Sequence, residues 1–150
     1  MGGGTTVLNG AHIEAIQMYG KQIFSPVLNI GNNVSIGQNF HIICAGNLII
    51  GNNVTISANV YISDVLHDYK KKDVPIKQDL IVEHTKIEDN CFIGYGAVIQ
   101  PGVVLGKQCI VGANAVVLKD VYPDYSVLAG VPAKVVRRLN DTIKIWEKEE

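Results

Sequence analysis

The sequence has no long apolar run and almost no net charge, and each absence excludes a class of partner. No stretch reaches the roughly 18 apolar residues that a membrane-spanning helix needs, so we expect no membrane span. The first residues lack the basic-then-apolar order of a secretory signal, and we therefore expect a cytoplasmic protein. Lys and Arg number 13 against 14 Asp and Glu, a net charge of -1. This balance argues against nucleic acid or an anionic membrane as the main partner.

Cysteine is scarce as well. The three cysteines, Cys44, Cys91 and Cys109, are odd in number and form no Cys-x-x-Cys pair. They predict neither a disulfide framework nor a structural zinc site, and we interpret them as small core residues. The 150 residues are 47% hydrophobic, enough to bury the core of one domain, which we expect to comprise residues 1–150.

What the sequence does have is a repeat of six residues. Aliphatic side chains recur at this spacing in three runs: Ile30, Ile36 and Ile42; Ile50, Ile56 and Ile62; Ile81, Ile87, Ile93, Ile99, Leu105, Val111 and Val117. The residue four places after each is small or β-branched in nearly every case, and glycine often follows the aliphatic residue directly. Each hexad therefore predicts a short strand and a corner, where glycine lets the backbone turn.

One hexad cannot bury its own apolar side chain, so the hexads must stack. Three hexads make a triangular coil of about 18 residues, and successive coils then lie about 4.8 Å apart, the spacing of parallel strands. Residues 30–36 and 50–56 are near copies and should lie on the same side of successive coils. Cys91 and Cys109 should stack likewise as buried thiols. The alternative, a β-sandwich, fits poorly because its strands alternate with a period of two and turn about every 8–12 residues.

The two ends of the chain are less regular. Residues 1–27 are expected either to begin the first coil irregularly or to carry a short helix around residues 14–18, and we assign them no function. Residues 28–138 should hold the β-helix. Residues 139–150 predict a short C-terminal helix, because their apolar side chains recur at helical spacing.

The repeat has one large interruption. From Ile62 to Ile81 the chain runs for 19 residues, and the polar stretch 63–80 must project outward from the coil as a loop. Loops on a rigid scaffold often carry function, and this loop contains His67. Histidine can accept a proton near neutral pH, so His67 is a candidate general base. The plainer interpretation is a solvated loop histidine.

The hexads, the segment 61–69 and the C-terminal motifs at 123–126 and 129–134 resemble the hexapeptide-repeat acetyltransferases. The resemblance is strongest to maltose or galactoside acetyltransferases and to the sugar O-acetyltransferases of surface-polysaccharide synthesis, and it covers about residues 28–138. It implies an all-β, left-handed parallel β-helix, assembled as a homotrimer, that transfers the acetyl group of acetyl-CoA to a sugar hydroxyl. The left hand follows from the resemblance alone, since about 98% of parallel crossovers are right-handed.

The resemblance also implies roles for individual residues. His67 would take the proton of the acceptor hydroxyl. The nearby carboxylates that could hold its imidazole are Asp64, Asp68 and Glu83, and we name Asp64 with His67 as catalytic. A backbone N–H near Gly94 and Tyr95 would stabilise the developing oxyanion.

Coenzyme A in this family lies along the groove between adjacent β-helices. The matching positions in this chain are Gly94, Tyr95, Gly112, Ala113, Lys119, Lys134 and Arg137, with Arg138 as a neighbour. Coil geometry explains the glycines equally well, and Lys119 is equally well explained as a surface lysine. The chain departs from the family at Phe92, where the family has Trp, and around residues 41–47, where the polar residue that helps hold a sugar has no clear match.

Three alternatives stay open. The acceptor could be an amine, as in acetylation of an amino sugar or antibiotic, or the β-helix could be a non-catalytic scaffold. A γ-type carbonic anhydrase would need three histidines on a metal, but the chain has no short His-x-His spacing, its histidines being His12, His41, His67 and His84. We therefore expect no metal to be required.

Overall fold

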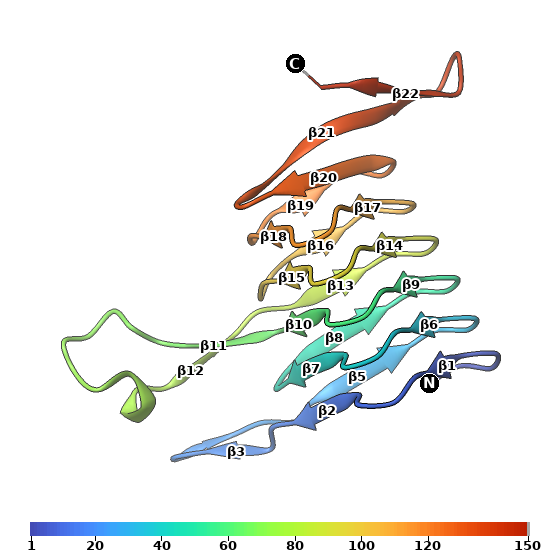
Figure 1. Ribbon diagram of the computed structural model, residues 1–150. Coiled ribbons are helices and arrows are strands. Elements are labelled where there is room, and N and C mark those ends of the chain that lie inside the picture. Colours follow the sequence, from blue (N-terminus) through green and yellow to red (C-terminus); the bar gives the residue numbers. More distant parts are fainter. Residues whose placement is uncertain (150) are drawn as a thin grey trace.

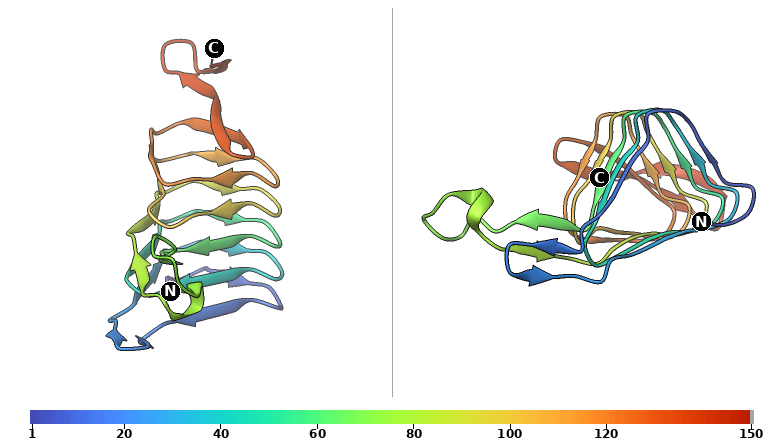
Figure 2. Two further views of the ribbon diagram at one scale, coloured as in Figure 1. Left: turned by 90° about the vertical axis from the view of Figure 1, so that its left-hand side faces the viewer. Right: turned by 90° about the horizontal axis from the view of Figure 1, so that it is seen from below.

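A computed structural model describes residues 1–149, which form a prism of stacked coils (Figure 1). Viewed along its axis the prism has a triangular outline (Figure 2). Each of its three faces is a sheet of parallel strands. The first face contains β1 (Thr6–Val7), β6 (Ser35–Ile36), β9 (Thr55–Ile56), β14 (Phe92–Ile93), β17 (Ile110–Val111) and β20 (Ser126–Gly130).

The other two faces are built in the same way. The second face contains β2 (His12–Ala15), β7 (His41–Cys44), β10 (Tyr61–Ser63), β15 (Val98–Ile99) and β18 (Val116–Val117). The third contains β5 (Val27–Ile30), β8 (Asn47–Ile50), β13 (Thr85–Ile87), β16 (Val104–Leu105) and β19 (Val121–Tyr122). The chain visits the first, second and third faces in turn, so each coil adds one strand to every sheet.

The hexad register is confirmed except at Ile81, which pairs with Leu66 outside the coil and does not enter the interior, so that the buried series resumes at Ile87. Ile30 pairs with Ile50 and Ile36 with Ile56, so the two near-copy segments do lie on successive coils. Aliphatic side chains fill the interior of the prism, where Ile36, Ile56 and Ile93 are at most 1% exposed. Each such burial contributes about 1.5–3 kcal/mol. Cys91 and Cys109 are also buried, as expected.

Asparagine, as well as glycine, makes the corners. Asn33, Asn53 and Asn90 have φ angles of 54°, 55° and 64°, a left-handed conformation that asparagine tolerates better than most residues. Their side chains also bond to one another from coil to coil, Asn33 Nδ2 to Asn53 Oδ1 at 3.3 Å and Asn53 Nδ2 to Asn90 Oδ1 at 3.2 Å. The corner residues therefore both turn the chain and link the coils.

The N-terminal residues begin the β-helix, and the short helix considered around residues 14–18 is wrong. β2 pairs along β7, and the two-stranded hairpin of β3 (Met18–Tyr19) and β4 (Gln22–Ile23) follows it. The reason is non-local: the edge of β7 offers unpaired backbone groups along its whole length, whereas a single helical turn gains little by itself.

The C-terminal helix expected at 139–150 is also wrong within the described residues. β21 (Ala133–Asn140) pairs antiparallel with β20, and β22 (Ile145–Lys148) pairs antiparallel with β21, extending the first face. A lone helix of about 12 residues is marginal in water, whereas the open edge of β20 accepts a strand. Leu139 and Trp146, which share a face in the helical pattern, are instead cross-strand partners.

The projecting stretch is confirmed, but it runs past the expected end at residue 80, because Ile81 and Val82 pair with the outgoing strand and the coil resumes only at Thr85. It is a hairpin with an irregular tip. β11 (Val65–His67) pairs antiparallel with β12 (Leu80–Val82), and a 3₁₀ turn, η1 (Pro75–Lys77), lies near the tip (Figure 1). We call residues 64–83 the loop hairpin. Across residues 1–149, no helix is long and apolar enough to cross a membrane.

Candidate functional site

The loop hairpin is fixed at its base by Asp64. This residue is fully buried, and its carboxylate accepts hydrogen bonds from the backbone N–H groups of Ala45 at 2.7 Å and Gly46 at 2.9 Å. The Cys44 thiol donates to the same carboxylate at 3.3 Å. Burial, together with the neighbouring Asp64 charge and hydrogen bond, raises the pKa of Cys44 to about 12, so this thiol stays protonated as a donor.

His67 ends β11 and faces a cavity of about 310 Å³ beside the second face. Glu14, Tyr19 and Tyr61 also line this cavity, which we call the His67 cavity. His67 Nδ1 lies 3.5 Å from the Tyr19 hydroxyl, and the two rings meet edge-on with centroids 5.4 Å apart. The Tyr19 hydroxyl donates its own proton to the carbonyl of Ile76 in the tip of the loop hairpin.

The β3–β4 hairpin, which carries Tyr19, packs against the loop hairpin. The Gln22 side-chain amide makes two hydrogen bonds to the backbone of Leu80, donating to its carbonyl oxygen at 3.0 Å and accepting from its N–H at 2.7 Å. A small apolar cluster joins the two hairpins, with buried Ala45, Val65 and Leu80 at its centre. The base of the loop and the wall that contains Tyr19 are therefore one packed unit.

None of the three candidate carboxylates is the hydrogen-bond partner of His67 in residues 1–149. Asp64 points to the Ala45–Gly46 backbone, and Asp68 accepts a bond from the backbone N–H of Lys70 at 2.9 Å. Glu83 pairs with Lys119 at 2.8 Å. The neighbour of His67 is Tyr19, which sequence reasoning missed because it lies in a segment with no hexad register and no motif.

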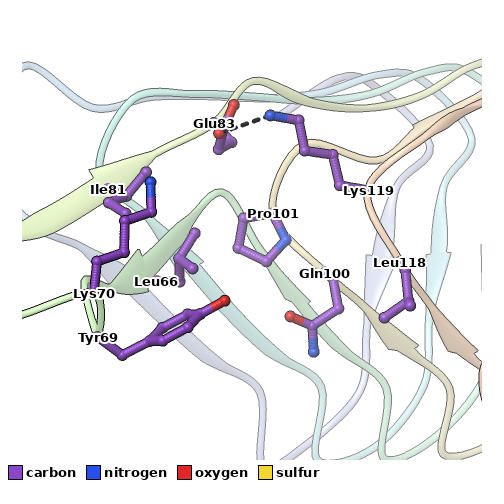
Figure 3. A pocket seen from close by; sticks show the side chains of 9 residues that line it. All are labelled: Leu66, Tyr69, Lys70, Ile81, Glu83, Gln100, Pro101, Leu118 and Lys119. Atoms are coloured by element: carbon purple, nitrogen blue, oxygen red, sulfur yellow. Dashed lines mark hydrogen bonds and ion pairs between the residues drawn. The ribbon is translucent and has the colours of Figure 1, made fainter. Parts of the chain in front are cut away.

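A second cavity, of about 270 Å³, lies on the other side of the loop hairpin (Figure 3). Tyr69 and Lys70 of the loop line it, and Gln100, Leu118 and Lys119 line it from the coils above. The dashed line in Figure 3 marks the Lys119–Glu83 ion pair, which joins the base of the loop to the coil. Lys119 therefore lies at the corner between the second and third faces, where the loop hairpin leaves the prism.

The predicted residues Gly94, Tyr95, Gly112 and Ala113 lie at a different corner, between the first and second faces. We call this the Gly94 corner. The Gly94 N–H donates to Val111 O at 2.8 Å, and a Cβ on Gly94 would lie 2.7 Å from Ala113 N. The close approach of the next coil therefore explains why this position is glycine, and the hydrogen bond to that coil already uses the Gly94 N–H. Tyr95 is 52% exposed, and its hydroxyl accepts a hydrogen bond from Asn59 Nδ2.

Lys134 and Arg137 lie on β21, toward the C-terminal end of the prism, and both are exposed. Their neighbour Arg138 lies 4.0 Å from the Glu149 carboxylate. The predicted residues are thus spread over the corner of the loop hairpin, the Gly94 corner and β21. One chain does not bring His67 and the Gly94 corner together on the same edge of the prism.

Two kinds of comparison relate the chain to known sequences. A family model described as "Hexapeptide repeat of succinyl-transferase" matches residues 27–64 and 84–119. The chain is 30% identical over 130 residues to the putative lipopolysaccharide biosynthesis O-acetyl transferase WbbJ of Escherichia coli K12, covering 81% of this chain and 66% of that protein. It is 36% identical over 124 residues to the galactoside O-acetyltransferase of the same organism, covering 76% of this chain and 58% of the relative. The chain thus spans about two thirds or less of the length of these relatives.

A solved structure resembles the whole prism. The hexapeptide-repeat-containing acetyltransferase VCA0836 of Vibrio cholerae, complexed with acetyl coenzyme A, superposes with a TM-score of 0.77 at 24% identity. The match covers 94% of this chain and 71% of that one. This similarity is one of fold, and the expected all-β, left-handed parallel β-helix is confirmed.

Proposed function

Because the chain belongs to the hexapeptide-repeat acetyltransferase family, we propose that it transfers the acetyl group of acetyl-CoA to a sugar hydroxyl, with His67 as general base. The acceptor would be a saccharide or a precursor of a surface polysaccharide, as the names of the relatives suggest. The observation that carries the proposal is the position of His67. It lies on the loop hairpin, which Asp64 fixes at its base through hydrogen bonds, and its side chain lines the His67 cavity.

The contacts of His67 favour the tautomer that a base needs. The single proton of the Tyr19 hydroxyl is donated to Ile76 O, so the Tyr19 oxygen can only accept from His67 Nδ1–H. A proton on Nδ1 leaves Nε2 unprotonated. Tyr19, rather than Asp64, is therefore the residue that we propose holds the imidazole.

The chemical step follows from this arrangement. His67 Nε2 takes the proton of the acceptor hydroxyl as its oxygen attacks the thioester carbonyl carbon. The carbon–sulfur bond then breaks, the acetyl ester remains on the acceptor, and the imidazolium returns its proton to the departing coenzyme A sulfur. The oxyanion donor would be the Tyr95 N–H, because the Gly94 N–H is already bonded to Val111.

The separation of the two corners supports a shared site. If the loop hairpin of one subunit faces the Gly94 corner of the next, then His67 and Tyr95 meet only in an assembly, and we propose a homotrimer. Coenzyme A would lie along Gly94, Tyr95, Gly112 and Ala113, and the cations of Lys119, Lys134 and Arg137 would pair with its phosphates. Lys119 would then exchange its Glu83 partner for a phosphate.

The test is acetyl-CoA turnover against a panel of sugars, nucleotide sugars and amine antibiotics, with the products located by mass spectrometry. A hydroxylamine-sensitive acetyl ester on a sugar supports the proposal. An acetyl amide formed in preference to an ester moves the activity to N-acetylation. Absence of coenzyme A binding together with absence of turnover would leave the β-helix as a scaffold and overturn the proposal.

A further inference from the structure

Two histidines and a glutamate from the first two coils meet on the outer surface of the second face. We propose that His12, Glu14 and His41 form a binding site for one divalent transition-metal ion of the Zn²⁺ type. This site is separate from the acetyl-transfer residues and does not depend on the proposed function. The cluster was not visible in the sequence, because His12 and His41 are 29 residues apart.

The register of the β-helix brings the three side chains together. His12 on β2 pairs directly with His41 on β7, so these side chains are neighbours on adjacent strands. Side chains two residues apart on a strand point to the same face of the sheet, which puts Glu14 beside His12 on the outside of the prism. Two rigid strands therefore hold all three groups at one place.

The distances suit a metal ion. One ligand atom from each of the three residues lies within 4.8 Å of the other two. His12 Nε2 and Glu14 Oε2 are 3.7 Å apart, and the two imidazole centroids are 4.5 Å apart with the rings tilted by 55°. Zn²⁺ binds imidazole nitrogen and carboxylate oxygen at about 2.0–2.2 Å, which sets tetrahedral ligands about 3.4 Å from one another. His12 and Glu14 are about half exposed, at 59% and 49%, so small side-chain rotations can close the remaining gap.

A second observation points to a ligand at the same place. His41 Nε2 is buried and has no hydrogen-bond partner, and it is the one side-chain nitrogen or oxygen of residues 1–149 in that condition. The Tyr61 ring packs on the other side of His41, with centroids 5.5 Å apart, and holds the imidazole in place. A buried polar atom without a partner is costly, and coordination to a metal ion would satisfy it.

Three protein ligands leave one position of a tetrahedral ion open. Glu14 also lines the His67 cavity, so an ion held here would lie at the edge of that cavity. Cysteines do not compete for the ion, because Cys44, Cys91 and Cys109 are all buried. Nickel and cobalt share the preference for imidazole, and Co²⁺ provides a visible spectrum that reports the geometry.

The test is a titration of the full chain, purified without a histidine tag and stripped with EDTA, with Zn²⁺ in a calorimeter. We expect one ion per chain, and Co²⁺ in its place should give the intense visible bands of a tetrahedral site. His12→Ala and Glu14→Gln change exposed side chains and should leave the circular dichroism spectrum unchanged. Loss of a group that only orients a ligand costs about 10–100-fold in metal affinity, so each of these variants should bind more than about 100-fold more weakly.

Two variants serve as matched controls. His84→Ala removes an exposed histidine that bonds to Asn47 O, outside the cluster, and should bind Zn²⁺ like the wild type. His67→Ala should also keep Zn²⁺ binding while losing acetyl transfer, which separates this proposal from the proposed function. Wild-type protein that binds no Zn²⁺ below about 100 µM, or His12→Ala protein that binds with unchanged affinity and stoichiometry, would overturn the site.

Discussion

At the scale of single residues, His67 is placed so that its chemistry can be tested apart from its packing. It is exposed at the end of β11 and contributes nothing to the interior of the prism. We predict that His67→Ala lowers kcat by about 10²–10⁴-fold, the usual loss for a positioned general base, while Tm hardly changes. The measurements are steady-state kinetics with an acceptor identified by the panel and a thermal melt. His84→Ala is the control, and if it abolished turnover while His67→Ala did not, the base would lie elsewhere.

For Asp64, three residues before His67, we expect a loss of stability and not a loss of catalysis. Its carboxylate accepts hydrogen bonds from the buried backbone N–H group of Ala45 and the partly buried one of Gly46. Asp64→Asn keeps the shape but replaces one oxygen by a donor that faces those N–H groups. We predict a loss of about 1–3 kcal/mol in the free energy of unfolding, measured by denaturant titration. A fall in kcat with unchanged stability would instead return Asp64 to the catalytic role that the sequence suggested.

At the scale of elements, the β3–β4 hairpin should act on catalysis through the loop. Its Gln22 side chain holds both backbone groups of Leu80, and Tyr19 contacts His67. We predict that Tyr19→Phe, which keeps the ring and removes the hydroxyl, lowers kcat about tenfold or more, because the imidazole loses the acceptor that fixes its tautomer. KM for acetyl-CoA should stay unchanged.

The matched control is Tyr69→Phe, a tyrosine of the same loop hairpin that is 73% exposed and lines the other cavity. Equal kinetic effects of the two substitutions would mean that Tyr19 has no particular role. A decrease confined to Tyr19→Phe and visible also in the pH profile of kcat would support its role in positioning His67.

The elements also show where sequence reasoning succeeds and where it stops. Strands with the hexad repeat were predictable because each aliphatic residue must enter the same interior column, as Ile36 and Ile56 do. The terminal strands were not, because β2 depends on the open edge of β7 and β21 on that of β20, and neither depends on its own periodicity. The spacing of Leu139 and Trp146 in the sequence fits one face of a helix, but in the structure they are partners on two paired strands.

In the candidate site, too, some features could be predicted from the sequence and others could not. The position of His67 in a projecting loop was predictable from the interruption of the repeat. The contact of Tyr19 with His67, and that of His12 with His41, were not, because each joins segments that only the coil register brings together. The role of Asp64 could not be judged either, since the groups that it binds lie on the preceding coil.

At the scale of the whole molecule, the proposed reaction needs two corners of the prism that one chain keeps apart. The loop hairpin leaves between the second and third faces, whereas Gly94 and Ala113 lie between the first and second. We therefore predict a homotrimer of about 49 kDa, three times the chain mass of 16.3 kDa, measured by light scattering at the protein concentration used for kinetics. A monomer at that concentration would contradict the shared site.

Mixing two inactive variants tests the shared site directly. His67→Ala removes the base at the loop hairpin, and Ala113→Glu places a charged side chain at an exposed position of the Gly94 corner, where it would repel the phosphates of coenzyme A. Suppose that each site combines the loop hairpin of one subunit with the Gly94 corner of the next. In a randomly reassembled equal mixture, half of the loop hairpins keep His67 and half of the corners keep Ala113, so a site is intact with a probability of one half times one half. The mixture should then recover about one quarter of wild-type activity after unfolding and refolding together, although each variant refolded alone stays inactive. No recovery from a mixture shown to contain mixed trimers would mean that each subunit carries a complete site of its own.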